Sequence, residues 1–181
     1  MAENETPTGT DATGADAGQQ QQSPPRLSII TQYVKDLSFE NPRAPSAMQG
    51  GQRPEIQINV DTRGRHVEND RYETELQINV NASAGGETVF VCELNYGGLF
   101  AIANMPENAV QPVLMIECPR LLFPFARRVI ADATRDGGFP PLMIDPIDFL
   151  GLYRRRLQQQ QEQQQQPNAG AETGAAPDGT T

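Results

Sequence analysis

Four segments of this chain alternate apolar and polar residues with a period of two, the pattern of β-strands that bury one face. These segments are 26–40, 55–62, 72–81 and 87–96. The fourth differs because apolar residues occupy both of its faces: Phe90, Cys92 and Leu94 on one, and Val89 and Val91 on the other. A strand buried on both faces in so small a sheet predicts that a second subunit covers it.

In segment 26–40 the alternation predicts which residues share a face. One set is Leu27, Ile29, Tyr33, Leu37 and Phe39, and the opposite set is Ser28, Gln32, Asp36, Ser38 and Glu40. Ile30 and Val34 add apolar character to the second set, so we expect part of that face to be covered as well. Residues 41–53 contain Pro42, Pro45, Gly50 and Gly51 and are too many for a tight hairpin, which predicts a long crossover loop.

The segment after the fourth strand is predicted to be helical. Its apolar residues at helical spacing are Leu121, Leu122, Phe125, Val129, Ile130 and Ala133. Pro119 suits a first turn, whereas Pro124 is expected to bend or break the helix. A last helix is predicted with Asp145 as its N-cap and Pro146 at its first position. The fold class is therefore α+β, with a four-stranded antiparallel sheet, a long crossover loop after strand 1, and C-terminal helices.

The two ends of the chain differ from its centre in composition. Residues 1–25 are almost wholly small or polar, and residues 158–181 surround a Gln-rich run. Neither end can bury enough apolar surface to offset the entropy of ordering. The sequence thus predicts a disordered N-terminal tail at 1–25, one folded domain at 26–157 and a disordered tail at 158–181.

The chain is acidic, with a formal net charge of −9. Residues 26–153 carry sixteen acidic and eleven basic side chains. Such a surface repels phosphate backbones, which argues against a nucleic-acid partner and favours a basic protein surface. The basic run Arg154-Arg155-Arg156 is either a solvated helix face or a binding site.

Cys92 and Cys118 lie among apolar residues and are expected to be buried free thiols. No leader pattern and no apolar run of about 18 residues is visible, so a cytoplasmic protein without membrane insertion is expected.

Catalytic patterns are missing from this sequence. Its single histidine, His66, lies in a polar stretch, and no phosphate-binding, nucleophile-elbow or metal-ligand spacing occurs. We therefore expect neither catalytic nor metal-binding residues, no cofactor and no enzymatic activity. A reaction that uses His66 and neighbouring acids is the alternative.

Exposed apolar residues of the crossover loop, of the second strand and of the last helix could line a binding groove. The alternative is that these residues complete the core.

Three motifs connect the chain with a known family. They are Tyr33-x-Lys35-Asp36-x-Ser38-Phe39-Glu40-x-Pro42-x-Ala44-Pro45, Cys118-Pro-Arg-Leu-Leu-Phe-Pro-Phe-Ala-Arg127 and Gly138-Phe139-Pro140-x-Leu142. Together they closely resemble SecB, the bacterial export chaperone family, over about residues 27–160. The resemblance implies a dimer of dimers without enzymatic activity or an ATP site, which binds non-native precursor proteins and delivers them to the SecA motor. The alternative is a SecB-like chaperone dedicated to one client, such as an antitoxin.

The resemblance also assigns roles to individual residues. Contact with SecA is carried over to Asp36, Glu40, Val91 and Glu93. The client-peptide groove is carried over to Pro45, Met48, Ile56, Ile58, Val60, Leu152, Tyr153 and Leu157. The oligomer interface is expected at Val89, Cys92 and Phe125. The chain departs from the family at Gln52 and Arg53, where relatives often carry a tryptophan, and at Arg154-Arg155-Arg156, where relatives tend to be acidic.

Overall fold

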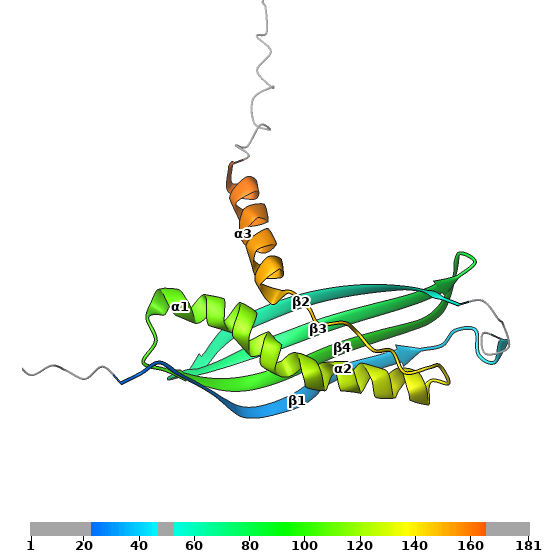
Figure 1. Ribbon diagram of the computed structural model, residues 1–181, viewed down its shortest axis with the longest axis horizontal. Helices are drawn as coiled ribbons and strands as arrows, with labels where there is room; N and C mark the ends of the chain where they lie inside the picture. The colour runs from blue at the N-terminus through cyan, green and yellow to red at the C-terminus, as the bar shows by residue number, and fades with distance from the viewer. Residues whose placement is uncertain (1–22, 47–52, 166–181) are drawn as a thin grey trace, which may run out of the picture.

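A computed structural model of the protein describes residues 23–46 and 53–165 (Figure 1). The strands are β1 (Arg26–Glu40), β2 (Glu55–Glu68), β3 (Arg71–Ala84) and β4 (Glu87–Ala103). They are followed by α1 (Glu107–Pro112), a π-helical turn η2 (Val113–Glu117), α2 (Cys118–Asp136) and α3 (Phe149–Gln165). All strand pairs are antiparallel, and the order in the sheet is β1-β4-β3-β2. The predicted α+β fold is confirmed, and the connection from β1 to β2 crosses from one edge of the sheet to the other.

Three strands are longer than the sequence predicts. β2 continues to Glu68, beyond the predicted segment 55–62, because residues 63–68 pair with the start of β3. Main-chain hydrogen bonds extend a hairpin irrespective of side-chain polarity, so alternation does not reveal the added length. The chain turns at Asn69, which has a φ of 48°, a left-handed conformation that asparagine tolerates well.

β1 carries two bulges that change which residues share a face. The register with β4 shifts between Ile29 and Thr31 and again between Val34 and Asp36. Tyr33 consequently pairs with Gly97 on the face of the sheet away from α2, which we call the open face. The prediction that Tyr33 shares a face with Leu27 is wrong, because each extra residue inverts the alternation. Asp36 and Glu40 remain on one face, as predicted.

α2 lies across the other face of the sheet (Figure 1) and buries only part of its predicted apolar stripe there, because Leu121 and Phe125 are exposed. Leu122, Ala126 and Ile130 have no accessible surface and pack in one cluster with residues of β3 and β4. The run of helix from Glu107 to Asp136 has the length and composition of a membrane span, but 44% of its most apolar window is buried inside the protein. Leu122, Ala126 and Ile130 of this run belong to the core of the single chain.

Pro124, expected to bend or break the helix, does not break it, since α2 continues through it to Asp136. Proline removes one backbone donor, and the acceptor left over is the carbonyl of Arg120. Arg120 and Pro124 both lie on the exposed side of α2, where water can replace the missing donor. The irregular turn lies upstream instead, at η2, directly before the stretch that contains Pro119.

α3 begins at Phe149, later than predicted. Asp148 Oδ1 accepts a hydrogen bond from the backbone N–H of Gly151 at 3.0 Å, the geometry of an N-cap. The assignment of this role to Asp145 is wrong, because the buried side chain of Ile144 ties that stretch of chain to the core in a non-helical conformation. α3 also extends to Gln165, so residues 158–165 are helical and the predicted boundary at 157 is corrected. This helix projects steeply from the sheet near β2 (Figure 1).

Candidate binding surfaces

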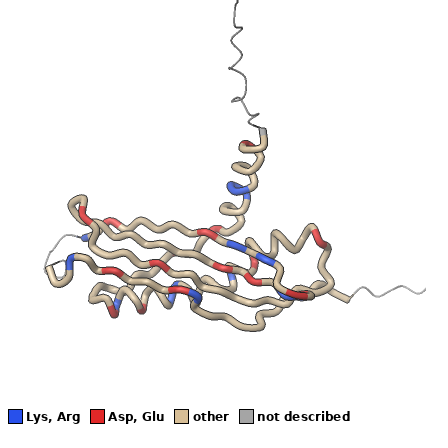
Figure 2. Tube along the Cα trace, turned by 180° about the vertical axis from the view of Figure 1, so that it is seen from behind, with Lys and Arg blue, Asp and Glu red and all other residues tan. Residues whose placement is uncertain are grey.

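The four residues carried over for SecA contact meet on the open face. Glu40 of β1 pairs with Val91 of β4, and Ser38 pairs with Glu93, so Glu40, Val91 and Glu93 are neighbours across two strands. Asp36 lies on the same face, opposite Asn95. Asp36, Glu40 and Glu93 are exposed, and Val91 is half-buried. Figure 2, which views the molecule from behind, shows acidic positions spread along the strands of this face.

A network of charged side chains occupies the same face further along β3. The Tyr33 hydroxyl donates a hydrogen bond to Glu73, which Arg65 also contacts, and Lys35 bonds to Glu75. Burial together with the bond to Glu73 raises the pKa of Tyr33 to about 12. Burial opposes ionisation of Glu73, but the hydrogen bonds from Tyr33 and Arg65 outweigh it and hold the pKa of Glu73 below its usual value.

The acids of the predicted SecA site take no part in this network. Glu73 and Glu75 are compensated by Lys35 and Arg65. None of Asp36, Glu40 and Glu93 forms an ion pair within residues 23–46 and 53–165. The uncompensated negative charge of the open face is therefore concentrated where β1 meets the first half of β4.

A hollow lies between α3, η2 and β2. Two adjoining parts of about 370 and 420 Å³ share Met115, Tyr153 and Arg156. Their further lining includes Val60, Asp61, Thr62, Arg63, Leu152, Arg155 and Leu157. We call this the α3 hollow. The structure thus brings together four predicted groove residues, Val60, Leu152, Tyr153 and Leu157, from segments almost a hundred residues apart in sequence.

The other predicted groove residues lie outside the α3 hollow. Ile56 and Ile58 lie on the same face of β2 as Val60, nearer to the crossover loop. Ile58 is 37% exposed. Pro45 is exposed in the loop and lines neither part of the hollow. Met48 lies outside the described residues. Met115 and Arg63 were missed by the sequence analysis because nothing in the sequence indicated that η2 faces β2.

Two of the predicted interface residues are buried within the single chain. Cys92 has no accessible surface and Val89 is only 6% exposed, and both belong to the core cluster that packs beneath α2. The expectation that a second subunit buries them is wrong, because the chain's own helix covers the Cys92 side of β4 and a register shift between Ala82 and Ser83 brings Val89 into the core. Phe125, by contrast, is 48% exposed and remains a predicted contact.

The two cysteines and the single histidine, for which no catalytic role was predicted, are explained by packing and local hydrogen bonding. Cys92 and Cys118 are buried free thiols, as predicted, and burial raises the pKa of the two thiols to about 11 and about 12. His66 Nε2 donates a hydrogen bond to the Asn69 carbonyl at 2.6 Å, and the ring packs edge-on against Tyr72. Within the described part of the chain, no group of three or more potential metal ligands occurs.

The fold and its surfaces define a class: an α+β protein whose antiparallel sheet keeps one face open and whose last helix borders a surface hollow. The sequence model described as preprotein translocase subunit SecB matches residues 19–160. Protein-export protein SecB of Maricaulis maris is 52% identical over 149 residues, covering 82% of this chain and 87% of that protein. The same protein of Afipia carboxidovorans is 51% identical over 149 residues, covering 82% and 91%. The chain belongs to the SecB family.

The fold has a counterpart among solved structures. A SecB-like chaperone of Mycobacterium tuberculosis, described in complex with a ChAD peptide from the HigA1 antitoxin, matches with a TM-score of 0.57 at 15% identity. The match covers 68% of this chain and 91% of that protein. At this identity the similarity bears on the fold alone.

Proposed function

We propose that this protein is a cytoplasmic, ATP-independent holdase that binds non-native precursor proteins, keeps them competent for translocation and delivers them to SecA. The observation that carries the proposal is the identity of about half of the aligned residues to protein-export chaperones, over most of both chains. The protein acts by binding, without catalysis and without a cofactor. The α3 hollow and the acidic end of the open face are the proposed sites for the two partners.

The α3 hollow and the adjoining side of β2 are the proposed client site. Tyr153 and Leu152 are half-buried, while Leu157 and Ile58 are 39% and 37% exposed, so each offers apolar surface to a ligand. Burial of one large apolar side chain contributes roughly 1.5–3 kcal/mol. Several such contacts retain an extended, unfolded segment without requiring a sequence motif, whereas folded proteins rarely expose the necessary side chains together.

The unpaired acids Asp36, Glu40 and Glu93, with Val91 beside them, are the proposed SecA site. Basic side chains of SecA would pair with these carboxylates, so the complex should weaken as salt is raised. The SecA site lies on the open face and the client site lies at the β2 edge on the other side of the sheet. A client can therefore remain bound while the chaperone docks.

Assembly as a dimer of dimers is part of the proposal. Apolar side chains remain exposed on both β1 and α2 in the single chain: Ile29, Val34, Leu37, Leu121 and Phe125. Exposed apolar surface of this kind on two neighbouring elements is typical of a subunit contact. The molar mass from light scattering tests this assembly directly.

The proposed function is tested by refolding a chemically unfolded, slowly folding protein with rising amounts of this protein and no nucleotide. We expect a delay that saturates at a fixed ratio of client to assembled oligomer, followed by release on addition of SecA. If several unrelated clients refold at their normal rate, the holdase proposal is refuted. A delay with only one client would favour a chaperone dedicated to that client. An antitoxin is one candidate, because the solved SecB-like chaperone is described in complex with an antitoxin peptide.

A further inference from the structure

The rim of the α3 hollow is basic, although the protein as a whole is acidic. Three arginines line it, Arg63, Arg155 and Arg156, and Asp61 is the single acidic residue among its described lining. We propose that this hollow selects client segments that carry a carboxylate beside a large apolar side chain. The inference rests on the proposed client-binding function and names the class of segment that this site prefers.

The arginines of the rim are not neutralised by their neighbours. Asp61 lies 3.4 Å from Arg156 and 3.8 Å from Arg63, so one carboxylate is shared between two guanidinium groups. Arg156 also donates a hydrogen bond of 2.7 Å to the Thr62 carbonyl, which holds its side chain at the edge of β2. Two positive charges therefore remain in excess at the rim, in a protein with a net charge of −9.

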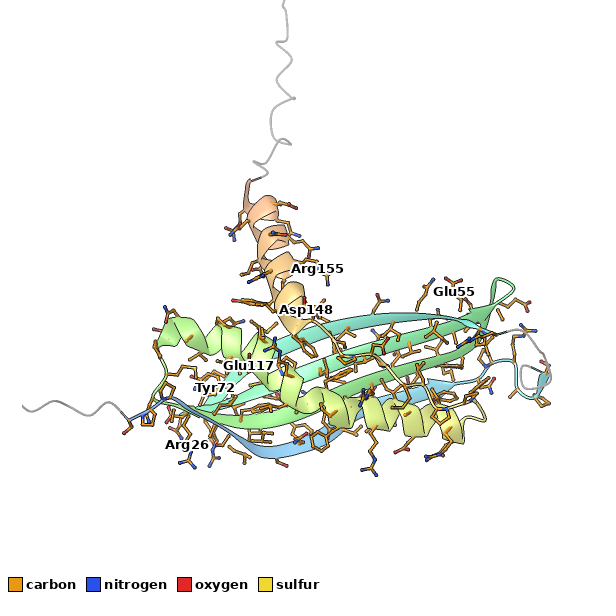
Figure 3. The ribbon with its side chains drawn as sticks, in the orientation of Figure 1. Arg26, Glu55, Tyr72, Glu117, Asp148 and Arg155 are labelled. Carbon is orange, nitrogen blue, oxygen red and sulfur yellow. The ribbon has the colours of Figure 1, made fainter. Side chains whose placement is uncertain are left out.

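Arg155 is the arginine most available to a ligand. It lines the part of the hollow that contains Val60 and Leu152, and no acidic residue of the described segments pairs with it. Figure 3 shows Asp148 at the base of α3 and Arg155 further along this helix. In Figure 2 the basic turn of α3 stands beside basic positions of the adjoining strand β2. The two elements converge on the hollow, as the contact between Arg156 and Asp61 also shows.

The apolar and basic groups of the hollow lie within reach of one ligand segment. Tyr153 and Met115 line both of its parts and can receive an apolar side chain. A carboxylate next to that side chain would then lie at the arginine rim, where a guanidinium can bind it with two parallel hydrogen bonds. A lysine at the same position would be repelled by the excess positive charge. The site thus combines a weak apolar affinity with a preference for negative charge.

The inference is tested with three peptides of equal length that share one core of Tyr and Leu and differ only in flanking residues, which are Asp, Asn or Lys. Their affinity for the full-length protein is measured by fluorescence anisotropy at low and at raised salt. We expect the Asp peptide to bind roughly two- to fivefold more tightly than the Asn peptide for each exposed charge pair gained, and the Lys peptide to bind most weakly. Raised salt should bring the three affinities together.

The arginine triplet of α3 offers a matched pair of variants. Arg155→Gln should remove most of the difference between the Asp and Asn peptides, while Arg154→Gln should preserve it, because Arg154 lines neither part of the hollow. Affinity for the Asn peptide should stay unchanged in both variants. Equal binding of the three peptides, or an equal effect of the two variants, overturns the inference and leaves the holdase function intact. Failure of all three peptides to bind would instead refute the proposed client site.

Discussion

Tyr33 of β1 and Glu73 of β3 are joined by a hydrogen bond even though β4 lies between their strands. The Tyr33 ring reaches Glu73 by crossing Gly97 of β4, where a Cβ atom would lie 2.6 Å from Tyr33 Cε2. The absence of a side chain at Gly97 makes this crossing possible. The contact fastens the edge strand to the centre of the sheet on the face proposed to dock SecA.

Gly97→Ala should destabilise the protein by about 1–3 kcal/mol, because the added methyl group displaces the Tyr33 ring and breaks its bond to Glu73. Urea denaturation followed by circular dichroism measures the change. The double variant with Tyr33→Ala is the control. Without the ring the methyl group meets no clash, so the same substitution should then be neutral or mildly stabilising, as expected for a strand glycine. An equal cost in both backgrounds would contradict the crossing contact.

The Glu73 network should make stability depend on pH in the acid range. The pKa of Glu73 is held below its usual value of 4.5, so its contribution is fully present above that pH and is lost as the pH falls through the folded-state pKa. Glu73→Gln should lower stability at neutral pH and make the acid decline shallower. Tyr33→Phe, which keeps the carboxylate but removes one donor, should be intermediate. Parallel declines in thermal midpoint for Glu73→Gln and the unmodified protein would argue against the linkage.

The double variant Asp36→Ala/Glu40→Ala should weaken SecA binding by about an order of magnitude or more, since two uncompensated carboxylates are removed from the proposed contact. Client binding should be unaffected. Surface plasmon resonance at two salt concentrations measures the affinity. Asp132→Asn, at a half-buried acid on α2 away from the open face, is the control and should retain SecA binding. Unchanged SecA affinity in the double variant would refute the docking assignment.

Tyr153→Asp should weaken capture of unfolded clients by about tenfold to a hundredfold, because one large apolar contact of roughly 1.5–3 kcal/mol is lost from the α3 hollow. Leu157→Ser, at a more exposed position of the same hollow, should act in the same direction with less effect. Delay of client refolding measures capture, and light scattering checks the oligomer. Dissociation of the oligomer by Tyr153→Asp would identify it as a structural residue instead.

Asp148→Ala should destabilise the start of α3 by about 1 kcal/mol, since the side chain caps the helix through the Gly151 N–H. Asp145→Ala should have little effect, although the two aspartates lie in the same connecting segment. Hydrogen exchange of amides in the first turn of α3 distinguishes the two variants. Equal protection in both would contradict the cap assignment.

Local pattern alone determined several features of this protein. The bounds of β1, the antiparallel sheet, the crossover after β1 and the helical conformation of α2 were all readable, because strand and helix periodicity depend on each segment's own residues. Of the predicted apolar stripe of α2, Leu122 and Ile130 are buried, whereas Leu121 and Phe125 are exposed. Alternation also placed Asp36 and Glu40 on one face, whereas their role in SecA contact, like that of Glu93, was carried over from the family resemblance and stays a prediction. The alternation failed at Tyr33, since a bulge depends on the partner strand.

Only the tertiary structure decided which distant segments meet. The burial of Cys92 under the chain's own helix, the crossing of Gly97 by Tyr33, and the convergence of Arg63, Arg155 and Arg156 on one hollow are set by packing between elements far apart in sequence. Periodicity reports one face of one element and carries no information about what lies opposite. The sequence therefore determined the elements and their apolar faces, while the packing of α2 and α3 against the sheet decided which side chains form the surfaces available for binding.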